Sequence, residues 1–516
     1  MRAVFKRSLR LTRAELAVLI AGTTSMGLEI LAGRIIAPQF GSSIYTWGSI
    51  IGVFLAALSL GYYRGGKEAE TNATYGRITS LLLFAAAYVA FLIFAGELML
   101  RASSVVPVPA RFASLVPVTI LFGPPVYMLG FISPYAAELS EKQNTGDAAG
   151  HVFALGTFGS IVGAFATTFF LIPSLSVDLI GFLFGSLLIL AAIRVALPTI
   201  PRQTLTTILF VSILLVGAVA GSSAGVVVSG DVVSQTQTPY QELRVVDSDG
   251  VRTLYLGGQR HSAMDLDQPN EHVFDYTRYF HLPLLMREDI DRVLFIGGGG
   301  FTGPKIFAEK YNVTVDVVEI DPVVIQTAKE YFRVQESEQL NIYNADGRQF
   351  LQSTNKTYDL IILDAYQKDK VPFHLTTKEF MQLASSKLDE NGILFANVIS
   401  APSGPGSEFY RAEYKTMAQV FPQVYSFPTS RTGFVQNIEL IATKNSRRVS
   451  KAELSERNRR RDIGLNLSHE ISFYRTDVKT GDVPVLRDDK APVAQLLDPM
   501  LGRKYVIETN ETASPA

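Results

Sequence analysis

The chain has 516 residues, of which 47% are hydrophobic and only 18% are charged. This composition is too apolar for a disordered protein and unusual for a soluble one, and the length allows more than one domain. With 47 Lys and Arg against 48 Asp and Glu, the chain has no basic excess to hold nucleic acid. Because it has no cysteine and its six histidines lack metal-site spacing, we expect neither disulfides nor a metal site.

Residues 1–230 predict a membrane domain, because long uncharged stretches alternate there with short charged segments. Seven apolar runs are long enough for the ~20 residues that a helix needs to cross a bilayer. The runs lie at about 15–37, 43–63, 77–97, 111–138, 150–173, 177–198 and 202–231. Pro124, Pro125 and Pro134 could break the fourth run into a re-entrant piece. We therefore expect about seven transmembrane helices and a multi-pass protein of the cell membrane.

Basic residues near the N-terminus predict the orientation of this domain. The residues that precede the first run are Arg2, Lys6, Arg7, Arg10 and Arg13. By the positive-inside rule they place the N-terminus in the cytoplasm. Seven crossings would then place the C-terminal half outside, and a helix count that differs by one would place it in the cytoplasm. Glu29, inside the first run, either lines a functional cavity or pairs with Arg34.

After residue 231 charged residues recur every few positions, which predicts a water-exposed domain. Segment 236–265 alternates apolar and polar residues around two turn pairs, Asp249-Gly250 and Gly257-Gly258. Such pairs between alternating runs are typical of β-hairpins. We expect a small β-hairpin unit here.

A βαβ nucleotide-binding unit is predicted from residue 292 onward. The buried strand 292–296 leads into a glycine-rich turn that opens a helix, and a second strand ends at Glu319. Gly297, Gly298 and Gly299 let the backbone approach a ligand, and a carboxylate placed like Glu319 can bind both ribose hydroxyls. Alternatively, Glu319 or Asp321 caps the helix that follows; we expect that one binds and the other caps.

Two further strands end in acidic residues. Asp346 and Gly347 follow the strand LNIYN, and Asp364 follows the apolar strand YDLIIL. In a doubly wound sheet these strand ends line one crevice. Asp346 could also be a simple turn residue. Asp364 is harder to explain structurally, because a buried strand rarely ends in a lone carboxylate without a purpose.

These motifs resemble those of a known family. The segments YQELRVV, GVRTLYLGGQRHSAMD, VLFIGGGG, VVEIDPVVIQTAKEYF, NADGRQFL, YDLIILDAY and RDDKAPV resemble spermidine synthases, and more closely the membrane-fused spermidine-synthase-like proteins. The N-terminal segment LEILAGRIIAPQFG is similar to the opening of that fused group. The resemblance implies a helical membrane domain followed by an α/β class I methyltransferase-like (Rossmann-like) domain with a small N-terminal β-hairpin region.

The resemblance also implies an activity and roles for residues. The family transfers an aminopropyl group from decarboxylated S-adenosylmethionine, a co-substrate rather than a tightly bound cofactor, to a polyamine such as putrescine. By motif, Gln241 corresponds to the donor-binding glutamine and Glu319 to the ribose ligand. Asp346 corresponds to the adenine ligand and Asp364 to the catalytic aspartate. The acceptor would lie near Asp275, Tyr276, Gln367 and Asp369, and a homo-oligomer is compatible with the family.

The chain departs from the family at three positions. Gly300 replaces the aspartate of the usual GGGDG motif, Gln367 replaces a second aspartate, and Phe274 replaces the usual tyrosine of the acceptor site. Donor-nucleoside binding is less affected by these changes than diamine specificity is. Two alternatives to the aminopropyltransferase therefore stay open: an S-adenosylmethionine-dependent methyltransferase, and a non-catalytic polyamine transporter or sensor.

The predicted organisation has three parts. A transmembrane domain covers residues 1–230, and a spermidine-synthase-like domain covers 231–445, with its Rossmann-like core at 290–445. A C-terminal extension, 446–516, carries the RDDKAPV segment and a tail that we expect to be disordered from Thr509.

Overall fold

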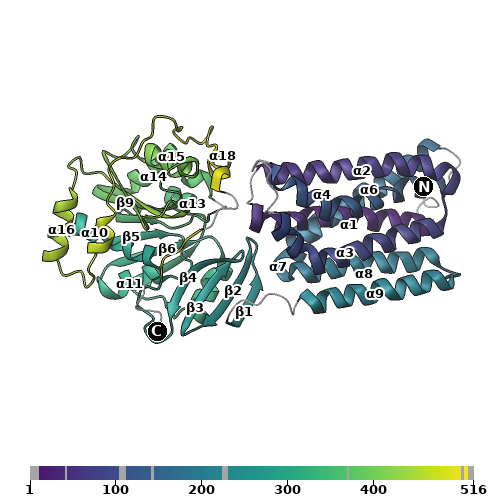
Figure 1. The fold of residues 1–516 in the computed structure, drawn as a ribbon, viewed down its shortest axis with the longest axis horizontal. Coiled ribbons are helices and arrows are strands. Elements are labelled where there is room, and N and C mark those ends of the chain that lie inside the picture. The colour runs from purple at the N-terminus through teal and green to yellow at the C-terminus, as the bar shows by residue number, and fades with distance from the viewer. Residues whose placement is uncertain are drawn as a thin grey trace, which may run out of the picture. The chain divides into compact units, whose positions relative to one another are not determined.

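The computed structural model describes residues 11–40, 44–103, 112–140, 145–222, 230–368, 371–500 and 505–509. The chain divides into two compact units, Met1–Val227 and Val228–Ala516, which are coloured from purple to blue and from teal to yellow in Figure 1. We call them the helical unit and the sheet unit.

The helical unit is built from long apolar helices that run side by side (Figure 1). Its helices are α1 (Arg13–Phe40), α2 (Ile44–Asn72), α3 (Tyr75–Ser103), α4 (Leu115–Gly130), α5 (Ile132–Glu138), α6 (Thr145–Ala166), α7 (Ile172–Ser174), α8 (Val177–Ala196) and α9 (Arg202–Ser222), with a π-helical turn at Thr167–Leu171. Among the described residues, seven helical stretches are long and apolar enough to cross a membrane. The predicted number of membrane-length helices is confirmed.

The fourth candidate span does not break where its first prolines lie. Helix α4 continues through Pro124 and Pro125, and the chain changes helix only at Phe131. The position of that change follows from Pro134 in α5, because a proline ring clashes with the carbonyl four residues earlier, here that of Gly130. Residues 115–138 together form one candidate span. The paired prolines therefore do not break it, and the change of helix lies near Pro134.

Helices α1 and α6 approach each other through glycines. A Cβ atom placed on Gly159 would lie 2.3 Å from the carbonyl oxygen of Leu19, and one on Gly163 would lie 2.2 Å from that of Thr23. Such distances mean that the two backbones touch. Small residues at a helix contact allow this approach and let backbone atoms pack directly.

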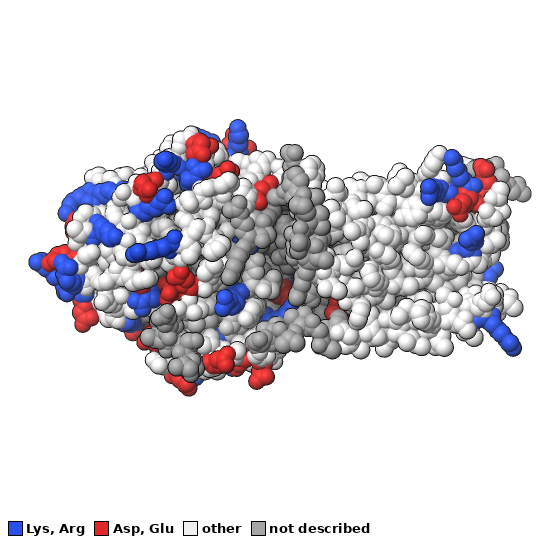
Figure 2. Space-filling model, viewed as in Figure 1, with Lys and Arg blue, Asp and Glu red and all other residues white. Residues whose placement is uncertain are grey.

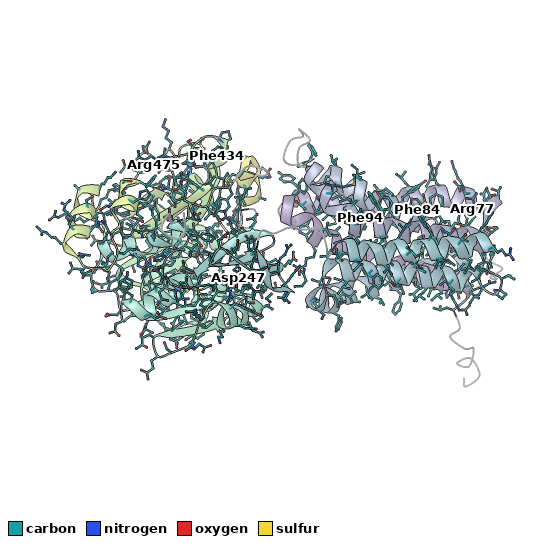
Figure 3. All side chains as sticks on the ribbon, turned by 60° about the horizontal axis from the view of Figure 1, so that its bottom comes forward. Arg77, Phe84, Phe94, Asp247, Phe434 and Arg475 are labelled. Atoms are coloured by element: carbon teal, nitrogen blue, oxygen red, sulfur yellow. The ribbon has the colours of Figure 1, made fainter. Side chains whose placement is uncertain are left out.

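The outer flank of the helical unit is apolar. In Figure 2 this flank is white between its ends, and charged side chains gather at one end. Figure 3 labels three residues of α3 along it: Arg77 near one end, and Phe84 and Phe94, which are 43% and 67% exposed. A contiguous apolar surface of this extent is of the kind that a lipid bilayer covers.

The sheet unit begins with a four-stranded antiparallel sheet in the order β1-β2-β3-β4. The strands are β1 (Asp231–Gln237), β2 (Glu242–Ser248), β3 (Val251–Leu256) and β4 (Gln259–Asp265). Asp249 and Gly250 form the β2–β3 turn with φ of 52° and 77°, as the primed two-residue hairpin turn requires. Strand β1 was not anticipated, because its seven residues are mostly polar and lack an apolar alternation.

The second sheet has seven strands in the order β10-β11-β9-β8-β5-β6-β7. Its strands are β5 (Arg292–Ile296), β6 (Thr314–Glu319), β7 (Leu340–Asn344), β8 (Tyr358–Leu363), β9 (Leu388–Ser400), β10 (Gln423–Pro428) and β11 (Gln436–Thr443). Strands β5 to β9 are parallel, whereas β11 pairs antiparallel with both β9 and β10. The predicted methyltransferase-like fold is confirmed.

Apolar cores lie on both faces of this sheet. Phe295 of β5 packs into one core and Leu294 into the other, as the two-residue period of a strand dictates. The helices of the unit are α10 (Leu282–Met286), α11 (Thr302–Lys310), α12 (Pro322–Tyr331), α13 (Gly347–Ser353), α14 (Lys378–Lys387), α15 (Glu408–Met417), α16 (Lys451–Arg460), α17 (Ser468–Ser472) and α18 (Val493–Leu497), with a 3-10 helix η3 at Asp275–His281.

The chain order creates a switch point between β5 and β8. From β5 the chain adds β6 and β7 on one side, and then returns to add β8 and β9 on the other. Ligands of open α/β sheets bind at the carboxyl ends of the strands at such a point.

The predicted disorder at Thr509 was wrong, because Thr509 forms a bridge with Phe274; residues 510–516 lie outside the described residues.

Candidate active site

The glycine-rich loop after β5 is held against the end of β8. Gly297 has a φ of +98°, and a Cβ atom there would lie 2.3 Å from the carbonyl oxygen of Asp364. Only glycine fits this position, because both the backbone conformation and the close approach exclude a side chain. The loop then leads into α11.

Glu319 at the end of β6 faces this loop. Its Oε2 accepts a hydrogen bond from the backbone N–H of Gly298 at 2.8 Å, and its Oε1 accepts one from that of Asp321 at 2.9 Å. Burial raises the pKa of Glu319, while both of these N–H donors lower it. Asp321 caps α12 by accepting from the N–H of Val323 at 3.0 Å. The two acids therefore have different structural tasks, and only Glu319 is directed to the glycine loop.

Asp346 caps helix α13, whereas the structural alternative predicted a simple turn residue, and one of its oxygens has another partner. Its Oδ1 accepts from the backbone N–H groups of Arg348 and Gln349, both at 3.0 Å. Its Oδ2 lies 3.1 Å from Nε2 of His374. A side chain on Gly347 would collide with Ile296 of β5. Asp346 and Gly347 thus bring the end of β7 against the strand that precedes the glycine loop.

Asp364 follows β8 and is bound by an amide from the neighbouring strand. Its Oδ1 accepts a hydrogen bond from Nδ2 of Asn397 on β9 at 2.8 Å. Burial raises the pKa of Asp364 to about 6, the hydrogen bond from Asn397 lowers it, and the charge of Glu319 raises it. An aspartate with this pKa is ionised near neutral pH and is a better proton acceptor than an ordinary one.

A pocket opens at Asp364 and the glycine loop. The space between the atoms that line it, counted together with the solvent at its mouth, is about 370 Å³. Its aromatic walls come from Phe274, Tyr276, Phe280 and Phe295. The hydroxyl of Tyr276 donates to the carbonyl oxygen of His261 at 3.2 Å. The pocket therefore combines one carboxylate with aromatic faces, which suits a cation with an aliphatic chain.

Two glutamines meet at one side of the site. Nε2 of Gln367 donates to Oε1 of Gln241 at 3.1 Å, and the backbone N–H of Gln241 donates to the hydroxyl of Thr238. Asp275 is not among the side chains that line the pocket; its charged neighbours include Arg278 and Glu508. The predicted acceptor residue Asp369 lies outside the described residues.

Four polar residues of the site were missed in the sequence. Ser262 of β4 accepts the backbone N–H of Gly300 at 2.9 Å, which ties the four-stranded sheet to the glycine loop. Asn397 and His374 bind the two predicted aspartates. Tyr240 lies near Glu319, Asp321 and Asp346, whose charges, after burial, raise its pKa. Tyr240 and Ser262 lie within the quoted segments YQELRVV and GVRTLYLGGQRHSAMD, whereas Asn397 and His374 lie outside the quoted segments. The partners of all four are set by the folded chain and not by a local pattern.

Within the described part of the chain, no group of three or more His, Asp or Glu side chains is placed to hold a metal ion. The site instead offers a glycine loop and an acid for a nucleoside, and a carboxylate in an aromatic pocket. A methyltransferase-like sheet with a glycine loop and acids at its switch point is the arrangement of a group transferase.

Comparisons with known proteins identify the family. A family model described as the spermine/spermidine synthase domain matches residues 274–437. The chain is 32% identical over 205 residues to a polyamine aminopropyltransferase of Vibrio vulnificus, covering 38% of this chain and 67% of that protein. It is 27% identical over 216 residues to one of Chromobacterium violaceum, covering 41% of this chain and 80% of that protein. A crystal structure of a probable spermidine synthase from Corynebacterium glutamicum aligns with a TM-score of 0.43 at 20% identity, covering 49% of this chain and 96% of that one.

The chain belongs to the polyamine aminopropyltransferase family, and its sheet unit carries the spermidine synthase domain.

Proposed function

We propose that this protein is a membrane-bound aminopropyltransferase that transfers an aminopropyl group from decarboxylated S-adenosylmethionine to a primary amine of a polyamine such as putrescine. The observation that supports this most strongly is Asp364, a half-buried carboxylate with a raised pKa, in an aromatic pocket beside the glycine loop. In this proposal Gln241, Glu319 and Asp346 hold the donor, and Tyr276 and Gln367 border the acceptor.

The chemistry follows from the properties of amines. A primary amine has a pKa near 10, so it is protonated and not nucleophilic at neutral pH. Asp364 holds the cation and accepts its proton. The free amine then attacks the carbon next to the sulfonium; the new C–N bond forms as the C–S bond breaks, and methylthioadenosine leaves. With a pKa of about 6, Asp364 accepts this proton more readily than an ordinary aspartate, whose pKa is about two units lower.

The proposed setting is the cell membrane, with the seven candidate spans anchoring the sheet unit. The apolar flank of the helical unit and the length of its helices support this setting. We also propose that the N-terminus lies in the cytoplasm, as the basic residues before the first span predict. Protease accessibility of the N-terminus and of the sheet unit in sealed vesicles tests the orientation, and finding the N-terminus outside would overturn it.

The enzymatic test uses the full chain in detergent with decarboxylated S-adenosylmethionine and several amines. We expect release of methylthioadenosine with putrescine or a related polyamine. Asp364→Asn should lower the rate by roughly 10²–10⁴ through loss of the general base, while methylthioadenosine still binds. If the wild type binds nucleoside but turns over no amine with either donor, the transferase proposal fails and a ligand sensor or transporter takes its place.

A methyltransferase is the second candidate, supported by one observation. At Gly300, where the family usually carries an aspartate, the backbone N–H is bound by Ser262 and no carboxylate is present to meet the amine of the decarboxylated donor. The two functions give different products from the same assay. Methyl transfer from ordinary S-adenosylmethionine leaves S-adenosylhomocysteine, whereas aminopropyl transfer leaves methylthioadenosine.

A further inference from the structure

One fully buried acid of the sheet unit has no partner. Glu439 of β11 is 0% exposed, and among the described residues neither of its carboxyl oxygens has a hydrogen-bond partner. Burial raises the pKa of Glu439 well above its ordinary value. A buried carboxyl group needs hydrogen bonds in either protonation state, and their absence costs one to several kcal/mol. We therefore expect a bound group to supply the missing hydrogen bonds of the Glu439 carboxyl group.

The position of Glu439 relates it to Asp364. Glu439 stands opposite Asn397 in the antiparallel pair of β11 and β9, and Asn397 donates to Asp364. Asn437, two residues before Glu439 and hence on the same face of the strand, donates to Oδ1 of Asn397 at 2.8 Å. The two acids thus lie on one face of the sheet with Asn397 between them. The charge of Asp364 adds to the raised pKa of Glu439.

A second unpartnered group lies near Glu439. The hydroxyl of Tyr279 on η3 is buried and has no hydrogen-bond partner among the described residues. The charge of Glu439 is one of the groups that, after burial, raise the pKa of Tyr279. The same short helix carries Tyr276 and Phe280, which line the pocket. The unpartnered acid and hydroxyl are therefore associated with the aromatic wall of the acceptor pocket.

Two other fully buried glutamates are satisfied differently. Glu413 accepts a hydrogen bond from the hydroxyl of Tyr366 at 3.1 Å, and Glu470 forms an ion pair with Arg278 at 2.5 Å. Each has at least one partner that explains its burial. Glu439 has no such partner, and it stands on β11 in the same row as Asn397 and Asp364 on the neighbouring strands.

We propose that Glu439 is a specificity-determining residue, which receives the distal ammonium of a diamine acceptor whose reacting nitrogen lies at Asp364. This inference rests on the proposed function. Gln367, which replaces a second acid of the family, is neutral and bonded to Gln241, so it supplies no charge for the far end of a diamine. Glu439 supplies that charge from another strand once the ammonium is bound, because an adjacent cation favours the ionised carboxylate.

The spacing of the strands fits a short diamine. Asp364 and Glu439 are two strand positions apart, which at about 4.8 Å per strand separates their backbones by about 10 Å. A charge-assisted hydrogen bond takes up about 2.8 Å at each end. About 4 Å then remains between the two nitrogen atoms, which suits a two- or three-carbon diamine or a bent four-carbon chain that runs along Asn397. Because Glu439 is not among the residues that line the pocket, the distal amine reaches it only if the side chains of η3, which contacts β11, move aside.

The test compares a diamine with a monoamine. The full chain in detergent is assayed with decarboxylated S-adenosylmethionine and either putrescine or butylamine, which lacks the distal nitrogen. We expect the wild type to have a KM for putrescine at least about 10-fold below that for butylamine. Glu439→Gln should raise the KM for putrescine by about 10- to 100-fold, the loss of one charge-assisted hydrogen bond, and leave the KM for butylamine unchanged. Glu439→Asp, which keeps the charge, should fall between the two.

Glu413→Gln is the matched control, because it is the same substitution at a fully buried glutamate that is bonded to Tyr366 instead. It should leave the ratio of the two KM values at the wild-type level. An unchanged putrescine KM in Glu439→Gln, or an equal rise for both amines, overturns the inference. If Glu439→Gln does not fold, the wild type and Glu439→Asp decide. Equal KM values for the two amines in the wild type overturn the inference, whereas a strong preference for putrescine that Glu439→Asp weakens supports it. Absence of turnover in the wild type contradicts the proposed function itself.

Discussion

Nε2 of Gln367 donates a hydrogen bond to Oε1 of Gln241 over 3.1 Å. Gln241 precedes β2 of the four-stranded sheet, and Gln367 lies in the loop after β8 of the seven-stranded sheet. This bond joins the two sheets at the edge of the site. An ionised aspartate at position 367 has no side-chain N–H or O–H to donate to this oxygen, so the replacement changes how Gln241, the proposed donor-binding glutamine, is held.

The bond between the two glutamines predicts a coupled effect on donor binding. We expect Gln367→Leu to weaken binding of methylthioadenosine by about 1 kcal/mol, because Gln241 loses the partner that orients it. Gln241→Leu should weaken binding by at least as much, and the double variant should add little. Titration calorimetry of the four proteins checks this cycle. Additive losses would mean that the two glutamines act independently.

A second prediction concerns the ribose ligand. Glu319→Ala should weaken methylthioadenosine binding by about 1.5–3 kcal/mol, since a charge-assisted contact to the ribose is lost. Asp321→Ala is the control, because Asp321 lies two residues away and caps α12. It should lower stability by about 1 kcal/mol and leave affinity unchanged. Equal losses of affinity in both variants, measured by calorimetry, would argue against a ribose contact at Glu319.

The pKa of Asp364 predicts how the rate depends on pH. Its pKa is raised to about 6, and the reactive form is the carboxylate, so kcat with a saturating acceptor should rise with pH and level off above about 6. Asn397→Ala removes a hydrogen bond that lowers this pKa, so its inflection should move to higher pH. A pH–rate profile from pH 5 to 9 checks both. An inflection that stays in place in Asn397→Ala would show that another group titrates.

The close contact of α1 and α6 predicts which glycines the helical unit needs. Gly159→Val would force a side chain against the backbone of Leu19 and should lower the thermal unfolding midpoint in detergent markedly. Gly150→Val on the same helix is the control, because a Cβ atom at Gly150 meets nothing within 4 Å. It should leave the midpoint within the error of the wild type. Equal shifts in both variants would rule out tight packing at Gly159 as the cause.

Much of the architecture was accessible from the sequence because its periodicities are local. The apolar run at 292–296 became β5, and the acids at strand ends came together because parallel strands share an edge. Asn397 could not be recognised as a partner of Asp364, since it is one amide in the apolar stretch ILFANVI of β9. Its meaning depends on β9 lying beside β8, which no local pattern states. Glu439 could not be recognised for the same reason, because it comes to lie opposite Asn397 only through the antiparallel register of β11.

The link between β5 and β8 has a mechanical consequence. The backbone N–H of Asp364 donates to the carbonyl oxygen of Ile296 at 2.9 Å, and Gly297 packs directly on the Asp364 carbonyl. In the proposed reaction the loop holds the donor and Asp364 receives the amine, so directly bonded parts of one sheet hold both reactants. The fold then sets the distance of attack, and the aromatic wall of the pocket together with Glu439 selects among amines.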